Sequence, residues 1–155
     1  MRKGFLALVL HAHLPFVRHP EYPEFLEEDW LFEAISETYV PLWQVLEGLA
    51  RDGVPFRLTM SMTPPLCAML DDELLRERYL RYLNRAIDLS EREIERTHNQ
   101  PDVNHLARLY HSRFREIKEI YVDRLRCDLV QAFRRFQDRG FLEIITCGPP
   151  TVSCL

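Results

Sequence analysis

The sequence has few glycines, no excess of basic residues and no apolar run long enough to cross a membrane. Only 5 of its 155 residues are glycine, and the net charge is −4. The longest apolar run falls far short of the roughly 20 residues that a membrane-spanning helix requires. The arginines are interleaved with acids instead of forming one basic stripe. We therefore expect neither a membrane nor a nucleic acid as a partner.

The sequence also lacks the patterns of a zinc site, a disulfide framework and a secretion signal. The four cysteines are Cys67, Cys127, Cys147 and Cys154. None of them forms a CxxC pair, so we predict neither bound zinc nor disulfides. The apolar stretch near the start is interrupted by His11, His13 and Arg18, and no small-residue cleavage site follows it. We predict a cytoplasmic protein without a cofactor.

An apolar run leads directly into two histidines near the start of the chain. Six apolar residues, 5–10, precede His11 and His13, and Pro15 follows. Such a run predicts a parallel strand that is buried on both faces. Because strand side chains alternate between faces, both histidines point the same way, at the end where α/β proteins bind ligands. The histidines are candidates for a binding site, or else each is a satisfied core or loop residue.

The rest of the chain alternates helical and strand patterns. We predict strands at 5–10, 54–60 and 141–147 and helices at about 27–52, 71–96 and 102–139. Pro41 should kink or divide the first helix, and Pro64-Pro65 should form a loop. This order predicts an α/β fold with a parallel sheet. The two long helices exceed a simple crossover, so they predict a helical-hairpin insertion over about 71–139.

Glu143 is an acidic residue inside the third, otherwise apolar strand. Its carboxyl group either turns to solvent or points into a polar pocket, and the sequence leaves both alternatives open. Three further histidines, His98, His105 and His111, lie on or between the two long helices. Histidines on charged helices are usually solvated, so we expect no catalytic role for these three.

Three segments of the chain resemble motifs of glycoside hydrolase family 57. They are His11-Ala-His13-Leu-Pro15, Glu27-Glu28 at the start of the first predicted helix, and Gly140-Phe-Leu-Glu143-Ile-Ile-Thr-Cys147. The resemblance covers residues 3–148 and is strongest to the 1,4-α-glucan branching enzymes of that family. Leu14 stands where the amylase-type members carry glutamine. The resemblance implies that residues 1–148 are the N-terminal part of an incomplete (β/α)7 barrel with a helical insertion at about 71–139.

The same resemblance implies retaining glycosyl transfer on α-1,4-glucan, which forms α-1,6 branches. It further implies that His11, His13 and Glu143 bind this substrate. In the family, the nucleophilic glutamate and the acid/base aspartate lie in later motifs, and no residue here matches them. We therefore assign no catalytic carboxylate and expect this chain to be inactive alone.

The last residues depart from the family pattern. The family continues with a run like Cys-Gly-Ala-Thr-His-Gly-Phe-Leu-Pro, whereas this chain has Pro-Pro-Thr-Val-Ser-Cys-Leu at 149–155. The codons permitted for this tail, read from the third base of the Gly148 codon, allow Ala-Thr-His-Gly-Phe-Leu-Pro. We therefore hypothesise that 149–155 is an out-of-frame tail, produced by a one-base deletion that is natural or a sequencing error, and that the chain is truncated.

Two other functions are also compatible with the sequence. A metal-dependent hydrolase could use His11 and His13 as ligands, although the later strands end in Met60-Ser61 and Thr146-Cys147 instead of histidine or aspartate. Alternatively, the helical hairpin could serve as a non-catalytic sugar-binding or assembly module. An incomplete barrel would also leave an exposed strand edge, so self-association through that edge is possible.

Overall fold

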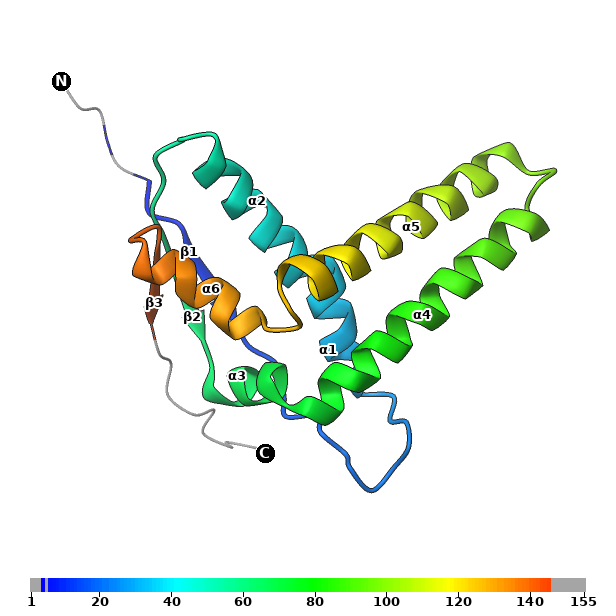
Figure 1. Ribbon diagram of the computed structural model, residues 1–155, viewed down its shortest axis with the longest axis horizontal. Coiled ribbons are helices and arrows are strands. Elements are labelled where there is room, and N and C mark those ends of the chain that lie inside the picture. Colours follow the sequence, from blue (N-terminus) through cyan, green and yellow to red (C-terminus); the bar gives the residue numbers. More distant parts are fainter. Residues whose placement is uncertain (1–3, 5, 146–155) are drawn as a thin grey trace.

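The computed structural model describes residue 4 and residues 6–145, and its three strands form one parallel sheet (Figure 1). The strands are β1 (Val9–Ala12), β2 (Leu58–Met62) and β3 (Leu142–Ile145), in the order β1-β2-β3. The predicted α/β class with a parallel sheet is confirmed. The tail at 149–155 lies outside the described residues.

The helical segments fill the two connections between the strands. They are α1 (Glu28–Ala34), a π-helical turn (Ile35–Tyr39), α2 (Val40–Arg51), α3 (Pro64–Asp71), α4 (Glu73–Arg96), α5 (Pro101–Glu119), a second π-helical turn (Ile120–Arg124) and α6 (Leu129–Asp138). No helix in the described part of the chain is both long and apolar enough to span a bilayer.

The first helix is disturbed beside Pro41, as predicted. A proline ring clashes with the carbonyl group four residues earlier, here that of Glu37. Glu37 lies in the π-helical turn at Ile35–Tyr39, where the wider backbone turn replaces regular α-helix. Regular α-helix resumes as α2, which ends before Gly53, a residue with a left-handed φ of 68°.

Two predicted boundaries are wrong. The Pro64-Pro65 pair begins helix α3 and does not form a loop, because prolines in the first turn of a helix need no N–H group. The single helix predicted at 102–139 is instead α5, a π-helical turn and α6. Arg126 and Cys127 between them have left-handed φ values of 56° and 59°, which a right-handed helix cannot include.

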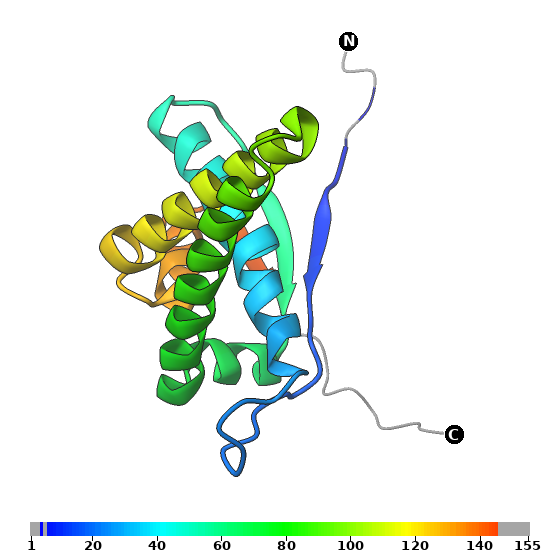
Figure 2. The same ribbon diagram turned by 90° about the vertical axis from the view of Figure 1, so that its right-hand side faces the viewer.

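The helices lie on one side of β1 and β2, as the turned view shows (Figure 2). Ala12, Met60, Met62 and Leu142 point toward this side and are buried. Helices α4 and α5 pack side by side in opposite directions and project away from the sheet (Figure 1). They correspond to the predicted helical hairpin.

The first strand is not buried on both faces, which corrects the prediction. Regular strand begins only at Val9, which is 59% exposed, and Leu6 before it is 93% exposed. The opposite face of the same strand carries Ala12, which is buried. Strand β1 is therefore covered by helices on one face only and is not enclosed between two helical layers. The apolar residues before Val9 lead into the strand without being buried.

Candidate functional site

The sheet face that points away from the helices carries polar side chains from all three strands. Because the strands are paired in register, the residues aligned across the sheet share a face. The two aligned rows are Val9, Thr59 and Glu143, and His11, Ser61 and Ile145. We call these six residues, together with His13 just beyond β1, the polar sheet face. It combines imidazole, hydroxyl and carboxyl groups.

His11 and His13 lie on this face together, as the alternation of strand side chains predicted. Their rings are stacked, with centroids 5.8 Å apart and planes inclined by 20°. Nδ1 of His11 is 2.5 Å from the hydroxyl oxygen of Ser61 on the neighbouring strand. Ser61 is only 5% exposed, whereas both histidines are exposed. A buried hydroxyl therefore holds one nitrogen of an exposed ring.

Glu143 points from β3 to the exposed side of the sheet. The hydroxyl group of Thr59 on β2 donates a hydrogen bond to its Oε2 atom over 3.1 Å. The sequence left open whether the Glu143 carboxyl group turns to solvent or points into a polar pocket. The structure supports the solvent-facing orientation, in which the carboxyl group is hydrogen-bonded to Thr59. Glu143 lies in the row next to that of His11, so the three predicted site residues share one face.

The prediction from sequence did not select Thr59 or Ser61. Both lie on the central strand β2 and bond to side chains of the outer strands. The available signal was the alternation of Thr59, Ser61 and Thr63 with methionines, which places every second residue on a polar face.

The loop after His13 is tied to the helices at several points. The Arg18 guanidinium lies 2.5 Å from a carboxylate oxygen of Asp72, and the Val17 N–H group donates to the sulfur atom of Met69. The pKa of Glu21 is lowered, first by a hydrogen bond from its own backbone and then by the His19 side chain. The contacts of Arg18 and Val17 hold the loop against α3 and the start of α4.

A buried ion pair anchors the same loop from the other side. The Arg78 guanidinium donates to the carboxylate of Glu28 and to the backbone carbonyl groups of His19 and Tyr22. Both charged side chains are almost fully buried. The pair therefore joins the loop, α1 and α4 at one point.

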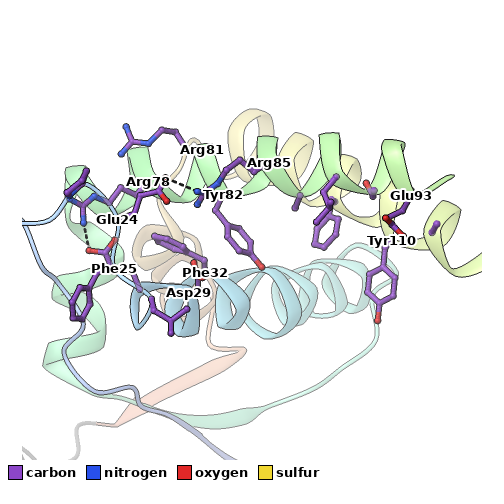
Figure 3. A pocket seen from close by; sticks show the side chains of 18 of the residues that line it. Glu24, Phe25, Asp29, Phe32, Arg78, Arg81, Tyr82, Arg85, Glu93 and Tyr110 are labelled. Atoms are coloured by element: carbon purple, nitrogen blue, oxygen red, sulfur yellow. Dashed lines mark hydrogen bonds and ion pairs between the residues drawn. The ribbon is translucent and has the colours of Figure 1, made fainter. Parts of the chain in front are cut away.

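A groove lies between the loop that precedes α1, helix α1 itself and the α4–α5 hairpin (Figure 3). This groove has a volume of about 770 Å³. Its lining includes Phe32 of α1, Tyr82 of α4 and Tyr110 of α5. None of the residues of the polar sheet face lines it, so the two surfaces are separate.

Most charged groups of the groove form ion pairs, either with one another or with a neighbour outside the groove. Arg85 lies 2.7 Å from the carboxylate of Glu24, and Arg78 is bonded to Glu28. Burial is the main cause that raises the pKa of Asp29, with Arg85 acting in the opposite direction. Such pairing indicates structural roles, so the polar sheet face remains the candidate site.

The three histidines on or between the two long helices lie away from the polar sheet face. His98 and His105 are exposed on the hairpin, and the half-buried His111 contacts the Ser90 hydroxyl at 3.1 Å. Among residue 4 and residues 6–145, no three His, Cys, Asp or Glu side chains are grouped closely enough to hold a metal ion.

The fold and the polar sheet face define an α/β protein whose parallel sheet offers hydrogen-bonding groups on the side opposite its helices. Imidazole, hydroxyl and carboxyl groups together can both donate and accept hydrogen bonds, as a polyhydroxylated ligand requires. The chain belongs to glycosyl hydrolase family 57, whose family model matches residues 7–148.

Solved structures of this family resemble the chain closely. The GH57-type branching enzyme from Pyrococcus horikoshii has a TM-score of 0.86 and 34% identity, over 94% of this chain and 27% of that one. The alpha-amylase AmyC from Thermotoga maritima has a TM-score of 0.84 and 43% identity, over 91% of this chain and 26% of that one.

A curated relative gives the same assignment. The 1,4-alpha-glucan branching enzyme TK1436 of Thermococcus kodakarensis is 34% identical over 146 residues, which are 93% of this chain and 21% of the relative. The chain therefore spans about a fifth of the length of this relative.

Proposed function

We propose that this chain is the N-terminal part of a 1,4-α-glucan branching enzyme and that the polar sheet face binds the glucan. His11, His13 and Glu143 are the binding residues. The enzyme transfers a glucan segment with retention and forms α-1,6 branches. Similarity to both a branching enzyme and an alpha-amylase supports an α-glucan as the substrate class.

The shared position of the three predicted residues carries this proposal. His11 and Glu143 are 132 positions apart in the sequence, yet the register of the strands brings them into adjacent rows of one exposed face. Each of these two side chains is also held by a hydroxyl group of β2.

The two unlike faces of the sheet support an incomplete (β/α)7 barrel. In a barrel of this kind, one face of each strand packs against the surrounding helices and the other points to the interior. Here Met60 and Leu142 point to the helices, while Ser61 and Glu143 point away from them. The polar sheet face would then form part of the inner wall, next to the substrate.

The chemistry requires more groups than we assign here. Retaining glycosyl transfer uses two carboxylates about 5 Å apart, one as nucleophile and one as acid/base. We assign Glu143 to binding and assign no catalytic carboxylate, so this chain should bind glucan without turnover. Imidazole groups beside the sugar would donate hydrogen bonds that strengthen as charge develops in the transition state.

Titration of the 155-residue chain with maltoheptaose by calorimetry tests the binding. We expect His13→Gln to weaken binding about three- to tenfold, the usual effect of one lost hydrogen bond. His105→Gln is the matched control, because the same change is made at an exposed histidine of the hairpin. Iodine staining of amylose in the presence of the chain should stay unchanged.

Three results would contradict the proposal. Absence of maltoheptaose binding by the wild-type chain would remove the polar sheet face as a glucan site. Equal losses in His13→Gln and His105→Gln would move the site to the helical hairpin. Binding of zinc that requires His11 and His13, without any binding of maltoheptaose, would favour a metal-dependent hydrolase.

A further inference from the structure

The central strand places one hydroxyl group against each outer strand. Ser61 reaches toward β1 and meets Nδ1 of His11 at 2.5 Å, and Thr59 reaches toward β3 and meets Oε2 of Glu143 at 3.1 Å. In both cases the two residues are aligned across the sheet and point to the same face. Two of the three assigned binding residues, His11 and Glu143, are therefore each supported by a neighbour on β2.

We propose that Ser61 and Thr59 are positioning residues, which set the ring nitrogen of His11 and the carboxylate of Glu143 in the orientation that receives the glucan. The proposal rests on the proposed function for the identity of the ligand. Its structural part, the control of His11 by Ser61, is measurable without any ligand. Neither residue is itself assigned a contact with the sugar.

The direction of the hydrogen bond between Ser61 and His11 depends on the tautomer of the ring. A hydroxyl group removed from water needs an acceptor for its proton, and the unprotonated nitrogen of a neutral imidazole is such an acceptor. In the proposed arrangement the Ser61 hydroxyl group donates to Nδ1 of His11. Because a neutral imidazole carries one proton, that proton then lies on Nε2, on the opposite side of the ring. His11 thereby presents an N–H donor to a sugar oxygen.

The Thr59 hydroxyl group acts on Glu143 in a simpler way. An ionised carboxylate can only accept hydrogen bonds, so the hydroxyl group donates to Oε2. This bond limits the rotation of an otherwise exposed side chain and leaves Oε1 for a sugar hydroxyl group. Holding the side chain before binding reduces the conformational entropy that binding would otherwise cost.

The first measurement determines which ring nitrogen of His11 carries the proton. Ring nitrogen shifts are recorded on the ¹⁵N-histidine-labelled chain at pH 8.5, where a free imidazole is neutral, and His11→Gln identifies the signals. We expect the wild-type ring to carry its proton on Nε2. Ser61→Ala should yield a mixture of both tautomers, and Ser61→Thr, which keeps a hydroxyl group, should restore the single form. Ser112→Ala on the exposed side of α5 is the control.

Affinity for maltoheptaose is the second measurement. Thr59→Val removes the hydroxyl group but keeps the shape of the side chain, and Thr59→Ser keeps the hydroxyl group. We expect Ser61→Ala and Thr59→Val each to weaken binding about three- to tenfold, and Ser61→Thr and Thr59→Ser to stay within about twofold of wild type. Backbone amide spectra would show that each variant keeps the fold.

The outcomes separate this proposal from the proposed function. A wild-type ring protonated on Nδ1, or an unchanged tautomer in Ser61→Ala, would overturn the positioning role even if maltoheptaose binds. The expected tautomer change without maltoheptaose binding would retain the control of His11 and overturn the glucan site. Equal affinity losses in Thr59→Val and Thr59→Ser would overturn the role of the Thr59 hydroxyl group.

Discussion

The two faces of the sheet differ although the same three strands form both. One face carries Met60 and Leu142, which are buried beneath helices. The other carries His11 and Glu143, which are exposed and form hydrogen bonds across the strands, His11 with Ser61 and Glu143 with Thr59. Alternate residues of one strand therefore differ in role: those that point to the helices stabilise the fold, and those that point away form the proposed site.

This division has a direct energetic consequence. Burial of apolar side chains is worth about 1.5–3 kcal/mol for each large residue, whereas exposed polar side chains contribute little to stability. Substitutions on the helical side should therefore destabilise the protein, and substitutions on the polar sheet face should alter binding at nearly constant stability. Four predictions compare buried residues of the helical side with exposed residues, beginning with the largest expected effect.

Arg78→Met should be the most destabilising change. It leaves the buried Glu28 carboxylate without its partner, and breaking a buried pair in this way typically costs about 3–5 kcal/mol. The measurement is the free energy of unfolding in urea. Arg81→Met is the matched control on the same helix, because the pair of Arg81 with Glu77 is exposed and should contribute at most about 1 kcal/mol. Equal losses in both variants would contradict a special role for the buried pair.

Met60→Ala should destabilise the protein by about 2–5 kcal/mol, because it leaves a cavity beneath the helices. Met60 is only 1% exposed. Val9→Ala on the opposite face of the neighbouring strand should change the stability by less than about 0.5 kcal/mol. Urea unfolding of both variants checks the prediction. Similar losses would show that both faces of the sheet are covered in solution.

Stability should fall as the pH rises above about 10, partly through Tyr39. Burial, with a smaller contribution from Cys67, raises the pKa of Tyr39 to about 12, compared with about 10 in an unfolded chain. Below pH 10 the side chain is neutral in both states and has no effect. Between pH 10 and 12 the unfolded state ionises first, so folding is weakened by up to about 1.4 kcal/mol per pH unit.

Tyr39→Phe isolates this effect. Urea unfolding at pH 9, 10 and 11 should show a shallower loss of stability in Tyr39→Phe than in the wild type. Tyr110→Phe, at an exposed position of α5, should follow the wild-type curve. Parallel curves for wild type and Tyr39→Phe would indicate that the Tyr39 hydroxyl group reaches solvent.

Glu143→Gln should have the smallest effect on stability, within about 0.5 kcal/mol, because the side chain is exposed and the amide can still accept from Thr59. The same variant should nevertheless weaken maltoheptaose binding. Thermal unfolding and calorimetric titration on one preparation measure both effects. A large loss of stability with unchanged binding would place Glu143 among the residues that hold the fold.

Much of the secondary structure was predictable, because periodic apolar residues report which face is covered. The helix beginning at Glu27-Glu28 and the disturbance at Pro41 are confirmed. The break at Arg126 and Cys127 was not predictable in this way. The apolar stripe continues across it, because α5 and α6 contribute to the same core.

The candidate site was predicted only in part. The histidine pair was predictable because both residues belong to one strand, and alternation alone fixes their common face. The partnership of Glu143 with Thr59, and of His11 with Ser61, depends on the register between strands 50 to 84 residues apart. No local pattern encodes that register.

The sequence by itself therefore determined most of the segments that become strands and helices, apart from α3 and the break between α5 and α6, and which side chains within a strand share a face. These properties follow from the geometry of the local backbone. Only the tertiary structure decided that all helices lie on one side of β1 and β2, that Arg78 reaches Glu28, and that β2 supplies hydroxyl groups to both outer strands. Such contacts depend on how segments far apart in the sequence pack together, and this packing is decided by the core as a whole.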